Sequence, residues 1–278
     1  ISVTAKVLAL KDFSWEISAG LGHYKNEVTA LPDGDKPVYT SLYGGEVVTQ
    51  VGGPVGLFYG YKTQGVFSTS EDAAFAGLRD GRADGDVFRG GDMHFADLVA
   101  DGVIDEKDKT VIGDPNPDIF GNFGTSLHYK NWTLNAFFSY SLGNDIYNYQ
   151  RAILEGGSTY YNQTTAVLNR WTSEGQVTEI PRAELGDPMG NSRFSDRWIE
   201  DGSYLKLKTL SLSYRIPFNY TFLQGITVWA AANNVFTCTK YLGSDPELSI
   251  SSSAVGQGID RGLLGRGRSF VLGVKTNL

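Results

Sequence analysis

The chain has 278 residues, a formal net charge of −7, 34 glycines, 13% aromatic residues and a single cysteine, Cys238. The acidic balance argues against nucleic acid as a partner, because phosphate binding requires a basic face. One cysteine excludes an internal disulfide, and the absence of any run of eighteen apolar residues excludes a transmembrane helix.

Seven segments alternate between apolar and polar residues with a period of two. A membrane-spanning β-strand needs only about 9–11 such residues. In chain order the expected strands are 1–9, 13–24, 121–129, 132–141, 204–217, 226–241 and 269–278. The sequence therefore predicts an all-β protein with about seven long antiparallel strands.

The connections between these segments alternate strictly between short and long. The long connections cover about 25–120, 143–203 and 242–267, and short turns lie between them. Outer-membrane barrels have short periplasmic turns and long extracellular loops, whereas a soluble sandwich mixes loop lengths at both ends. Aromatic residues near the strand ends agree with interfacial girdles. The pattern favours a barrel segment with three extracellular loops.

Alternation also assigns side chains to the two faces of the sheet. In the fourth segment Trp132 and Leu134 fall on one face, and Thr133 and Asn135 fall on the other. A slip of one residue would reverse every assignment. The side chains expected to face the lumen are Lys6, Thr133, Asn135, Ser211, Arg215 and Lys275.

The stretch "DLVADGVIDEKDKTVIGDPNPD" has the rhythm of a calcium loop. Placing Asp97 first puts Asp101, Asp105 and Asp108 at positions 5, 9 and 12, with glycine at position 6. Position 3 is Val99, which has no side-chain oxygen, and no helices flank the stretch. Two interpretations stay open: a calcium site formed by the four aspartates, and an acidic loop held by its own hydrogen bonds.

Catalytic patterns are absent from the sequence. His23, His94 and His128 are far apart and show no metal-ligand spacing. "GLLGRGR" has no P-loop lysine, and no serine lies in a G-x-S-x-G elbow. We therefore expect no enzyme activity and no cofactor, calcium excepted.

Five segments together resemble the C-terminal part of SusC/RagA-type TonB-dependent outer-membrane transporters of Bacteroidetes. They lie in the family's order and cover nearly the whole chain. They are "DFSWEISAGLGHYKNEV", "GGPVGLFYGYKTQGVF", "DGVIDEKDKTVIGDPNPDIFGNFG", "RWIEDGSYLKLKTLSLSYRIP" and "NNVFTCTKYLGSDPEL". Val99 departs from the D-x-N-x-D-G form of the acidic loop, and Leu278 departs from the usual aromatic last residue.

The resemblance implies a location in the bacterial outer membrane and a barrel of roughly 22 strands. Seven strands cannot close such a barrel, so we expect a longer protein whose plug domain and TonB-contacting N-terminal region are not part of this chain. It also implies a SusD-like surface lipoprotein as partner, contact with membrane lipid, and a cargo of glycan oligosaccharide or oligopeptide.

Loop residues that could contact cargo or the partner are aromatic and amide side chains in the second long loop. Aromatic rings can stack on sugars, and amides can bond hydroxyl groups; the alternative role is packing of the loop itself. The candidates are Tyr160, Tyr161, Asn162 and Trp171. Two other interpretations of the whole chain are a soluble β-rich carbohydrate-binding module and a passive porin or adhesin barrel.

Overall fold

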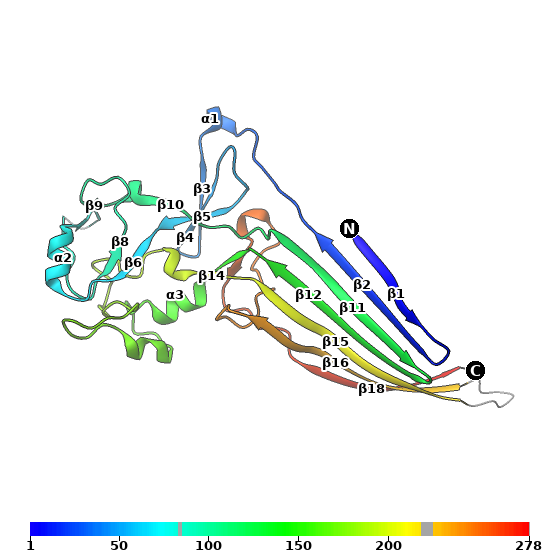
Figure 1. Cartoon of the computed structure of the whole chain (residues 1–278). Coiled ribbons are helices and arrows are strands. Elements are labelled where there is room, and N and C mark those ends of the chain that lie inside the picture. Colours follow the sequence, from blue (N-terminus) through cyan, green and yellow to red (C-terminus); the bar gives the residue numbers. More distant parts are fainter. Residues whose placement is uncertain (83–84, 218–224, 278) are drawn as a thin grey trace.

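The computed structural model describes residues 1–82, 85–217 and 225–277. Its largest element is one antiparallel sheet of seven strands, which lie side by side in chain order (Figure 1). The strands are β1 (Ser2–Ala9), β2 (Phe13–Gly22), β11 (Ile119–Tyr129), β12 (Trp132–Leu142), β15 (Tyr204–Ile216), β16 (Gly225–Thr239) and β18 (Ser269–Asn277). All seven predicted strands are confirmed, with ends shifted by at most two residues.

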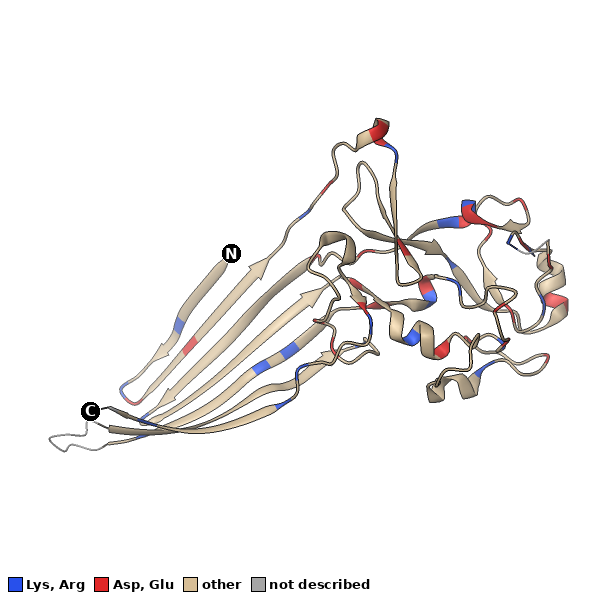
Figure 2. Ribbon diagram, turned by 180° about the vertical axis from the view of Figure 1, so that it is seen from behind, with Lys and Arg blue, Asp and Glu red and all other residues tan. Residues whose placement is uncertain are grey.

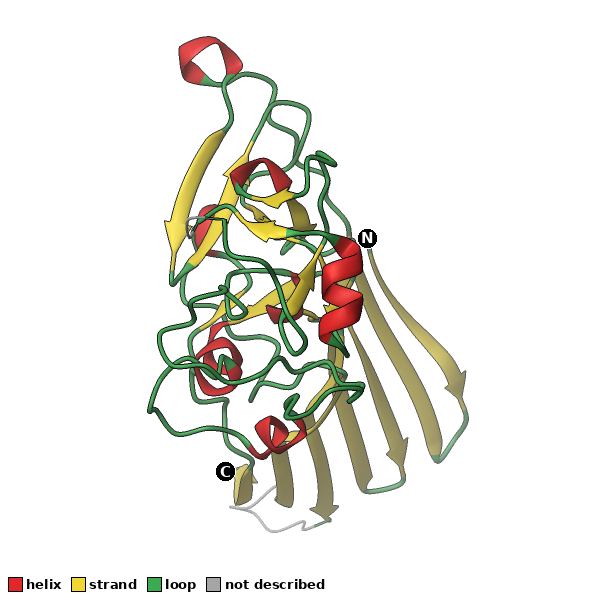
Figure 3. Ribbon diagram, turned by 90° about the vertical axis from the view of Figure 1, so that its left-hand side faces the viewer, coloured by secondary structure: helices red, strands yellow, loops and turns green. Residues whose placement is uncertain are grey.

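The two ends of this sheet differ as predicted. Short turns join β1 to β2 and β11 to β12 at one end, and the three long connections leave from the other (Figure 1). The predicted turn at 217–225 lies mostly outside the described residues. Viewed from the loop end, the sheet curves as a barrel wall does (Figure 3). Within the described residues β1 and β18 each pair on one side only, so the sheet is an open segment.

Strand pairing confirms which side chains share a face, because directly opposed residues project to the same side. One row of pairs runs across five strands through Lys6, Glu16, Ser126, Asn135 and Ser211. Thr133 pairs with Ser213, and Arg215 and Lys275 both pair with Thr227, on this same face. The six residues predicted to face the lumen therefore all share one polar face.

Alternation fails at one place in β1. The register shifts between Lys6 and Leu8, so a β-bulge moves Leu8 to the face opposite Lys6, beside Trp15. The sequence predicts one face shared by alternate residues through Ala9, and this is wrong beyond Lys6. A bulge adds one residue to one strand and inverts every side chain that follows it.

Aromatic residues form two bands on the apolar face. Near the short turns Phe13, Tyr129, Trp132 and Tyr214 lie in one row, and the rings of Trp132 and Tyr214 are 4.6 Å apart. Toward the loops, Phe123 and Phe138 stack at 4.4 Å. The bands lie roughly 20 Å apart along β12, which suits the apolar belt of about 25 Å on an outer-membrane barrel.

The long connections fold into a compact region beyond the strand ends, where most charged residues also lie (Figure 2). They contain three further small sheets, a four-stranded sheet, and several short helices. The strands are β3 (Val38–Leu42), β4 (Gly45–Thr49), β5 (Leu57–Tyr61), β6 (Thr63–Val66), β7 (Arg79–Asp80), β8 (Met93–Phe95), β9 (Val103–Ile104), β10 (Lys109–Gly113), β13 (Asp145–Asn148), β14 (Ile199–Asp201) and β17 (Ile259–Asp260). The helices are α1 (Pro32–Asp35), α2 (Ser70–Ala76), α3 (Tyr149–Glu155), η1 (Glu106–Asp108), η2 (Thr165–Asn169), η3 (Asp196–Trp198) and η4 (Ala254–Gly256).

Two hydrophobic cores hold this loop region together. One is built around Phe88, Met93, Phe95 and Ile104 from the first connection, with Met189 from the second. The other joins all three connections through Val47, Phe58, Tyr147, Trp198 and Ile259. The side chain of Trp198 is fully buried. The ranges predicted as long loops are therefore a folded unit with its own interior.

In the described part of the chain, no helix has both the length and the apolar character needed to cross a membrane.

Candidate functional site

Helix α3 contributes lining residues to two pockets of the loop region. Its start is fixed by Asn148, whose side-chain oxygen accepts a hydrogen bond from the backbone N–H of Arg151 at 3.0 Å. This is the usual role of asparagine at a helix N-cap. Arg151 and Glu155, one turn apart, pair at 2.9 Å, and Arg151 also reaches Glu200 of β14 at 2.9 Å. These contacts hold α3 against the hydrophobic core that contains Trp198.

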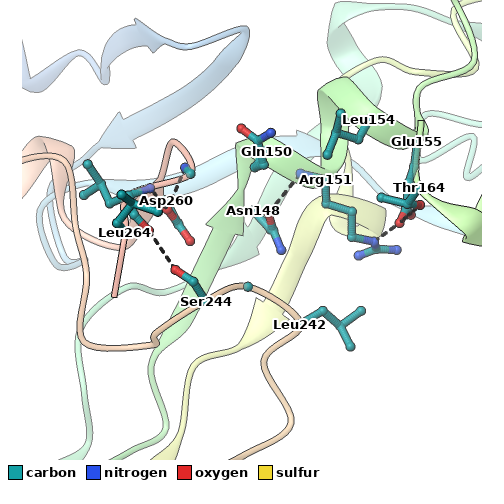
Figure 4. Close-up of a pocket in the computed structure, with 13 residues that line it drawn as sticks. Asn148, Gln150, Arg151, Leu154, Glu155, Thr164, Leu242, Ser244, Asp260 and Leu264 are labelled. Carbon is teal, nitrogen blue, oxygen red and sulfur yellow. Dashed lines mark hydrogen bonds and ion pairs between the residues drawn. The ribbon is translucent and has the colours of Figure 1, made fainter. Parts of the chain in front are cut away.

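A pocket of about 370 Å³ lies between α3 and the third long connection (Figure 4). Its polar groups come from Gln150 and Asp260 among others, and Leu242 and Leu264 stand on its rim, 72% and 94% exposed. The hydroxyl of Tyr241 donates to Asp260 at 2.6 Å. Burial, followed by this bond, raises the pKa of Tyr241, so the phenol stays protonated at neutral pH.

A second pocket of about 410 Å³ adjoins the first and shares Arg151, Glu155 and Leu242 with it. Arg197 lines it and lies 4.2 Å above the indole of Trp198. Burial, and next the nearby Arg151 guanidinium, lower the pKa of Arg197 to about 10. The two pockets combine apolar walls with a few fixed polar groups, which is the usual composition of a ligand-binding site.

A cluster of charges, the clasp, ties the third connection to the polar face of the seven-stranded sheet. It consists of Lys206 and Lys208 of β15 with Asp245 and Glu247 of the loop. The Lys206 ammonium lies 2.7 Å from Asp245 and 2.9 Å from Glu247, and its side chain is only 3% exposed. Ser139 of β12 also donates to Glu247, at 3.2 Å. The third connection is thereby held against the end of the strands from which the long connections leave.

Electrostatics stabilise the charged form of Glu247. Burial alone would raise the pKa of this carboxyl, but hydrogen bonds from Lys208 and Lys206 outweigh it and lower the pKa to about 2. The clasp residues belong to two of the segments that resemble the family, "DGSYLKLK" and "SDPEL", yet the sequence did not predict their contact. The sequence did contain a signal for this contact. Lys206 and Lys208 lie two residues apart near the start of one strand, and Asp245 and Glu247 lie two residues apart after the next strand.

The side-chain oxygens of the four candidate aspartates accept hydrogen bonds from the backbone of the loop itself. Asp97 accepts from the N–H groups of Ala100 and Gly102 at 2.7 and 2.8 Å. Asp108 accepts from Leu98 at 2.8 Å and from Asp105 at 2.9 Å, and its side chain is buried.

The other two aspartates are engaged in the same way. Asp101 and Asp105 accept from Val103 and Lys107, and the Lys107 ammonium lies 3.7 and 3.3 Å from their carboxylates. Over the described ranges no three His, Cys, Asp or Glu side chains are grouped to hold a metal. This geometry favours the hydrogen-bonded loop; calcium binding by the four aspartates stays a prediction.

The four predicted contact residues are not placed alike. Tyr160 and Tyr161 are 90% and 68% exposed, and Asn162 is exposed beside them. Trp171 instead donates from its indole N–H to the carbonyl of Ser68 at 3.0 Å and covers Gly91, where a Cβ would collide with the ring. Trp171 therefore joins the second connection to the first, and none of the four lines the two pockets beside α3.

Comparison with known proteins identifies the chain's family. No family model matches it. The chain is 33% identical to TonB-dependent receptor P3 of Formosa agariphila over 288 residues, 98% of this chain and 28% of that protein. It is 30% identical to TonB-dependent receptor P26 of the same organism, and 26% identical to TonB-dependent receptor SusC of Bacteroides thetaiotaomicron over 98% of this chain.

Solved structures of the RagAB peptide transporter show the same fold. One matches with a TM-score of 0.78 at 24% identity over 98% of this chain and 28% of that chain. Another, of RagAB in the open-open state, matches with a TM-score of 0.77 at 22% identity over the whole of this chain. This chain spans between 25% and 28% of the length of the relatives named here.

The chain belongs to the TonB-dependent receptors of the SusC/RagA type, which are proteins of the bacterial outer membrane. Its seven-stranded sheet is a segment of their transmembrane β-barrel. The relatives are receptors and importers by name, which confirms the expectation that the protein is not an enzyme and favours the barrel over a soluble module.

Proposed function

We propose that the receptor containing this chain imports an oligomeric nutrient across the outer membrane, powered through TonB and assisted by a SusD-like surface lipoprotein. The observation that carries the proposal is a folded, pocketed loop region clasped to the polar face of a barrel segment. A passive pore needs no such region, whereas a receptor must bind its cargo before transport. The related RagAB proteins, named as a peptide importer, and SusC support the same class of activity.

The cargo is an oligosaccharide or an oligopeptide. The pockets beside α3 hold about 370 and 410 Å³, which suits one or two units of a longer ligand. The exposed tyrosines Tyr160 and Tyr161 offer aromatic faces of the kind enriched at protein interfaces. We assign this tip to contact with the lipoprotein or with cargo held between the two proteins.

Deletion of the receptor gene tests the proposal. We expect the deletion strain to grow normally on the monomeric nutrient and poorly on the oligomer, and a plasmid copy to restore growth. A tag on the receptor should co-purify a SusD-like surface lipoprotein. Equal growth of both strains on every oligosaccharide and peptide mixture, or uptake unaffected by a protonophore, would contradict the proposal.

A further inference from the structure

A stripe of exposed apolar side chains runs along β18, the red strand at one edge of the large sheet (Figure 1). Phe270 pairs with Ala232 in a row that continues to Ala136 on the apolar face of the sheet. Phe270 and Leu272 are 81% and 84% exposed. A further barrel strand at the free edge of β18 would lie in the plane of the sheet and leave this stripe uncovered. The stripe therefore faces lipid.

The chain just before β18 adds two arginines to this stripe. Arg268 stands two residues before Phe270, and Arg266 stands two residues before Arg268, so the three positions share one face of an extended chain. The side-chain amide of Asn234 donates to the carbonyl of Gly267 at 3.1 Å. This hydrogen bond keeps the chain beside β16 although the regular pairing of the two strands has ended.

The other side of the same segment faces the interior. A Cβ on Gly265 would lie 3.0 Å from the Cβ of Asp245, whose carboxylate pairs with Lys206 of the clasp on the polar face. On either side of Gly265, Leu264 is 94% exposed and Arg266 is exposed as well. The alternation is therefore kept from 264 to 270, and both guanidinium groups lie on the lipid-facing side.

The two arginines lie close to the loop-side aromatic band of the apolar face. Phe236 belongs to this band, because its ring centroid lies 6.5 Å from that of Phe138. Asn234, which holds Gly267, stands only two residues before Phe236, and two residues of a strand span about 7 Å. Aromatic bands mark the two interfaces of an outer-membrane barrel. Both guanidinium groups are therefore at the depth of the lipid headgroups.

The protein does not neutralise these two cations. Elsewhere in the loop region Arg151 pairs with two carboxylates and Arg193 pairs with one. Within residues 1–82, 85–217 and 225–277, no ion pair includes Arg266 or Arg268. Basic side chains at the edge of a lipid-facing surface attract anionic headgroups.

We propose that Arg266 and Arg268 bind a phosphate of a phosphorylated glycolipid in the outer leaflet, whose acyl chains lie against Phe270 and Leu272. Outer-membrane barrels have their long loops outside, and the outer leaflet of this membrane is built from phosphorylated glycolipid. Each guanidinium can donate two parallel hydrogen bonds to phosphate oxygens. The two side chains start about 7 Å apart on one side of the chain, so both can reach one phosphate. The site is independent of the imported nutrient.

Lipid binding to the delipidated, detergent-purified receptor, measured by native mass spectrometry, tests the inference. The probes are bisphosphorylated lipid A and the same glycolipid after removal of both phosphates. We expect the phosphorylated form to bind about tenfold more tightly, because two cations contribute to its binding. The double variant Arg266→Gln with Arg268→Gln should bind the two lipids equally. Both residues are exposed, so this variant should keep the thermal midpoint of the wild type.

The matched control removes two exposed cations at the opposite end of the sheet. Lys11 lies in the turn between β1 and β2, and Lys130 lies in the turn between β11 and β12. Lys11→Gln with Lys130→Gln makes the same change in net charge and should leave lipid binding as in the wild type.

Three results would overturn the inference. The wild-type receptor could bind both lipids equally, which would assign binding to the acyl chains alone. The arginine variant could keep the preference for phosphorylated lipid, or both double variants could lose it to the same extent. Displacement of the lipid by a millimolar excess of inorganic phosphate would show that the guanidinium groups hold free phosphate instead of a headgroup.

Discussion

The ammonium of Lys206, the third residue of strand β15, lies 2.7 Å from Oδ2 of Asp245 in the third long connection. Both side chains are nearly inaccessible, at 3% and 7% exposed. The contact joins residues 39 positions apart and holds the loop against β15, the neighbour of the strand from which the loop starts. A loop attached in this way cannot move without separating buried charges.

Removing Lys206 should release the loop. In Lys206→Ala, Asp245 stays buried without its cation, and Glu247 keeps Lys208 and the hydroxyl of Ser139. Breaking one side of a buried ion pair is unfavourable by about 3–5 kcal/mol. We expect faster proteolysis within 242–267 and a lower thermal midpoint of the purified receptor. Lys25→Ala, which breaks the exposed Lys25–Glu27 pair, is the control and should change little. Equal cleavage rates in both variants would show that the clasp does not hold the loop.

Acid should weaken the same contact. The folded-state pKa of Glu247 is lowered to about 2 from an ordinary value of 4.5. A lowered carboxyl pKa contributes stability that is fully present above pH 4.5 and disappears as the pH falls toward 2. We therefore expect hydrogen exchange in 242–267 to be slow at pH 5 and to accelerate progressively below about pH 4.5, after correction for intrinsic exchange rates. In Glu247→Gln, hydrogen exchange in 242–267 should be faster than in the wild type at pH 5 and should change less as the pH falls. If the exchange rates of the variant and the wild type depend on pH in the same way, other carboxyl groups cause the acid response.

Trp198 should be the single most sensitive position of the loop region. It is fully buried, its indole N–H donates to the carbonyl of Arg193 at 3.2 Å, and Arg197 covers one ring face. Trp198→Ala should lower the free energy of unfolding of this region by about 3–5 kcal/mol. Phe75→Ala, at a site 95% exposed, should change it by less than about 0.5 kcal/mol. Chemical denaturation followed by loop cleavage measures both; similar midpoints would mean that the loop region is not held by this core.

Trp171 and Tyr160 should separate structural from binding roles. Trp171→Ala removes the bond to Ser68 and uncovers Gly91, so we expect reduced loop stability. Tyr160→Ala should leave stability unchanged, because the side chain is 90% exposed, and should reduce recovery of the co-purified lipoprotein or cargo affinity. A thermal scan and a pull-down on the same preparations distinguish the two. Loss of stability in Tyr160→Ala would remove it from the candidate contacts.

The barrel segment could be predicted from sequence because its signal is local. Alternation in β12 assigns Thr133 and Asn135 to one face without any knowledge of their partners. The bulge between Lys6 and Leu8 could not be predicted, since it depends on pairing with β2 and leaves the residue pattern apparently regular. Side-chain period fixes a face only until an extra residue is inserted.

The fold of the loop region could not be predicted from the sequence, for a different reason. Its strands are two to five residues long, and Phe58 and Ile259 share a core although two hundred positions separate them. Short elements carry too few residues for a period to stand out. The pairing of Lys206 with Asp245 is likewise long-range. The two motifs could therefore be recognised in the sequence, but the contact between them could not be predicted.

The acidic stretch offers the last test, because its two interpretations predict opposite responses to calcium. If the carboxylates bond the loop's own backbone, Asp108→Ala removes the hydrogen-bond acceptor of the N–H groups of Leu98 and Asp105. Hydrogen exchange at both N–H groups should then accelerate. An unsatisfied buried donor is unfavourable by about 1–3 kcal/mol. Millimolar calcium should then leave the thermal midpoint of the wild type where it is. A calcium-dependent rise that disappears in Asp97→Asn and Asp105→Asn would establish the metal site instead, since a ligand that binds only the folded state raises its stability.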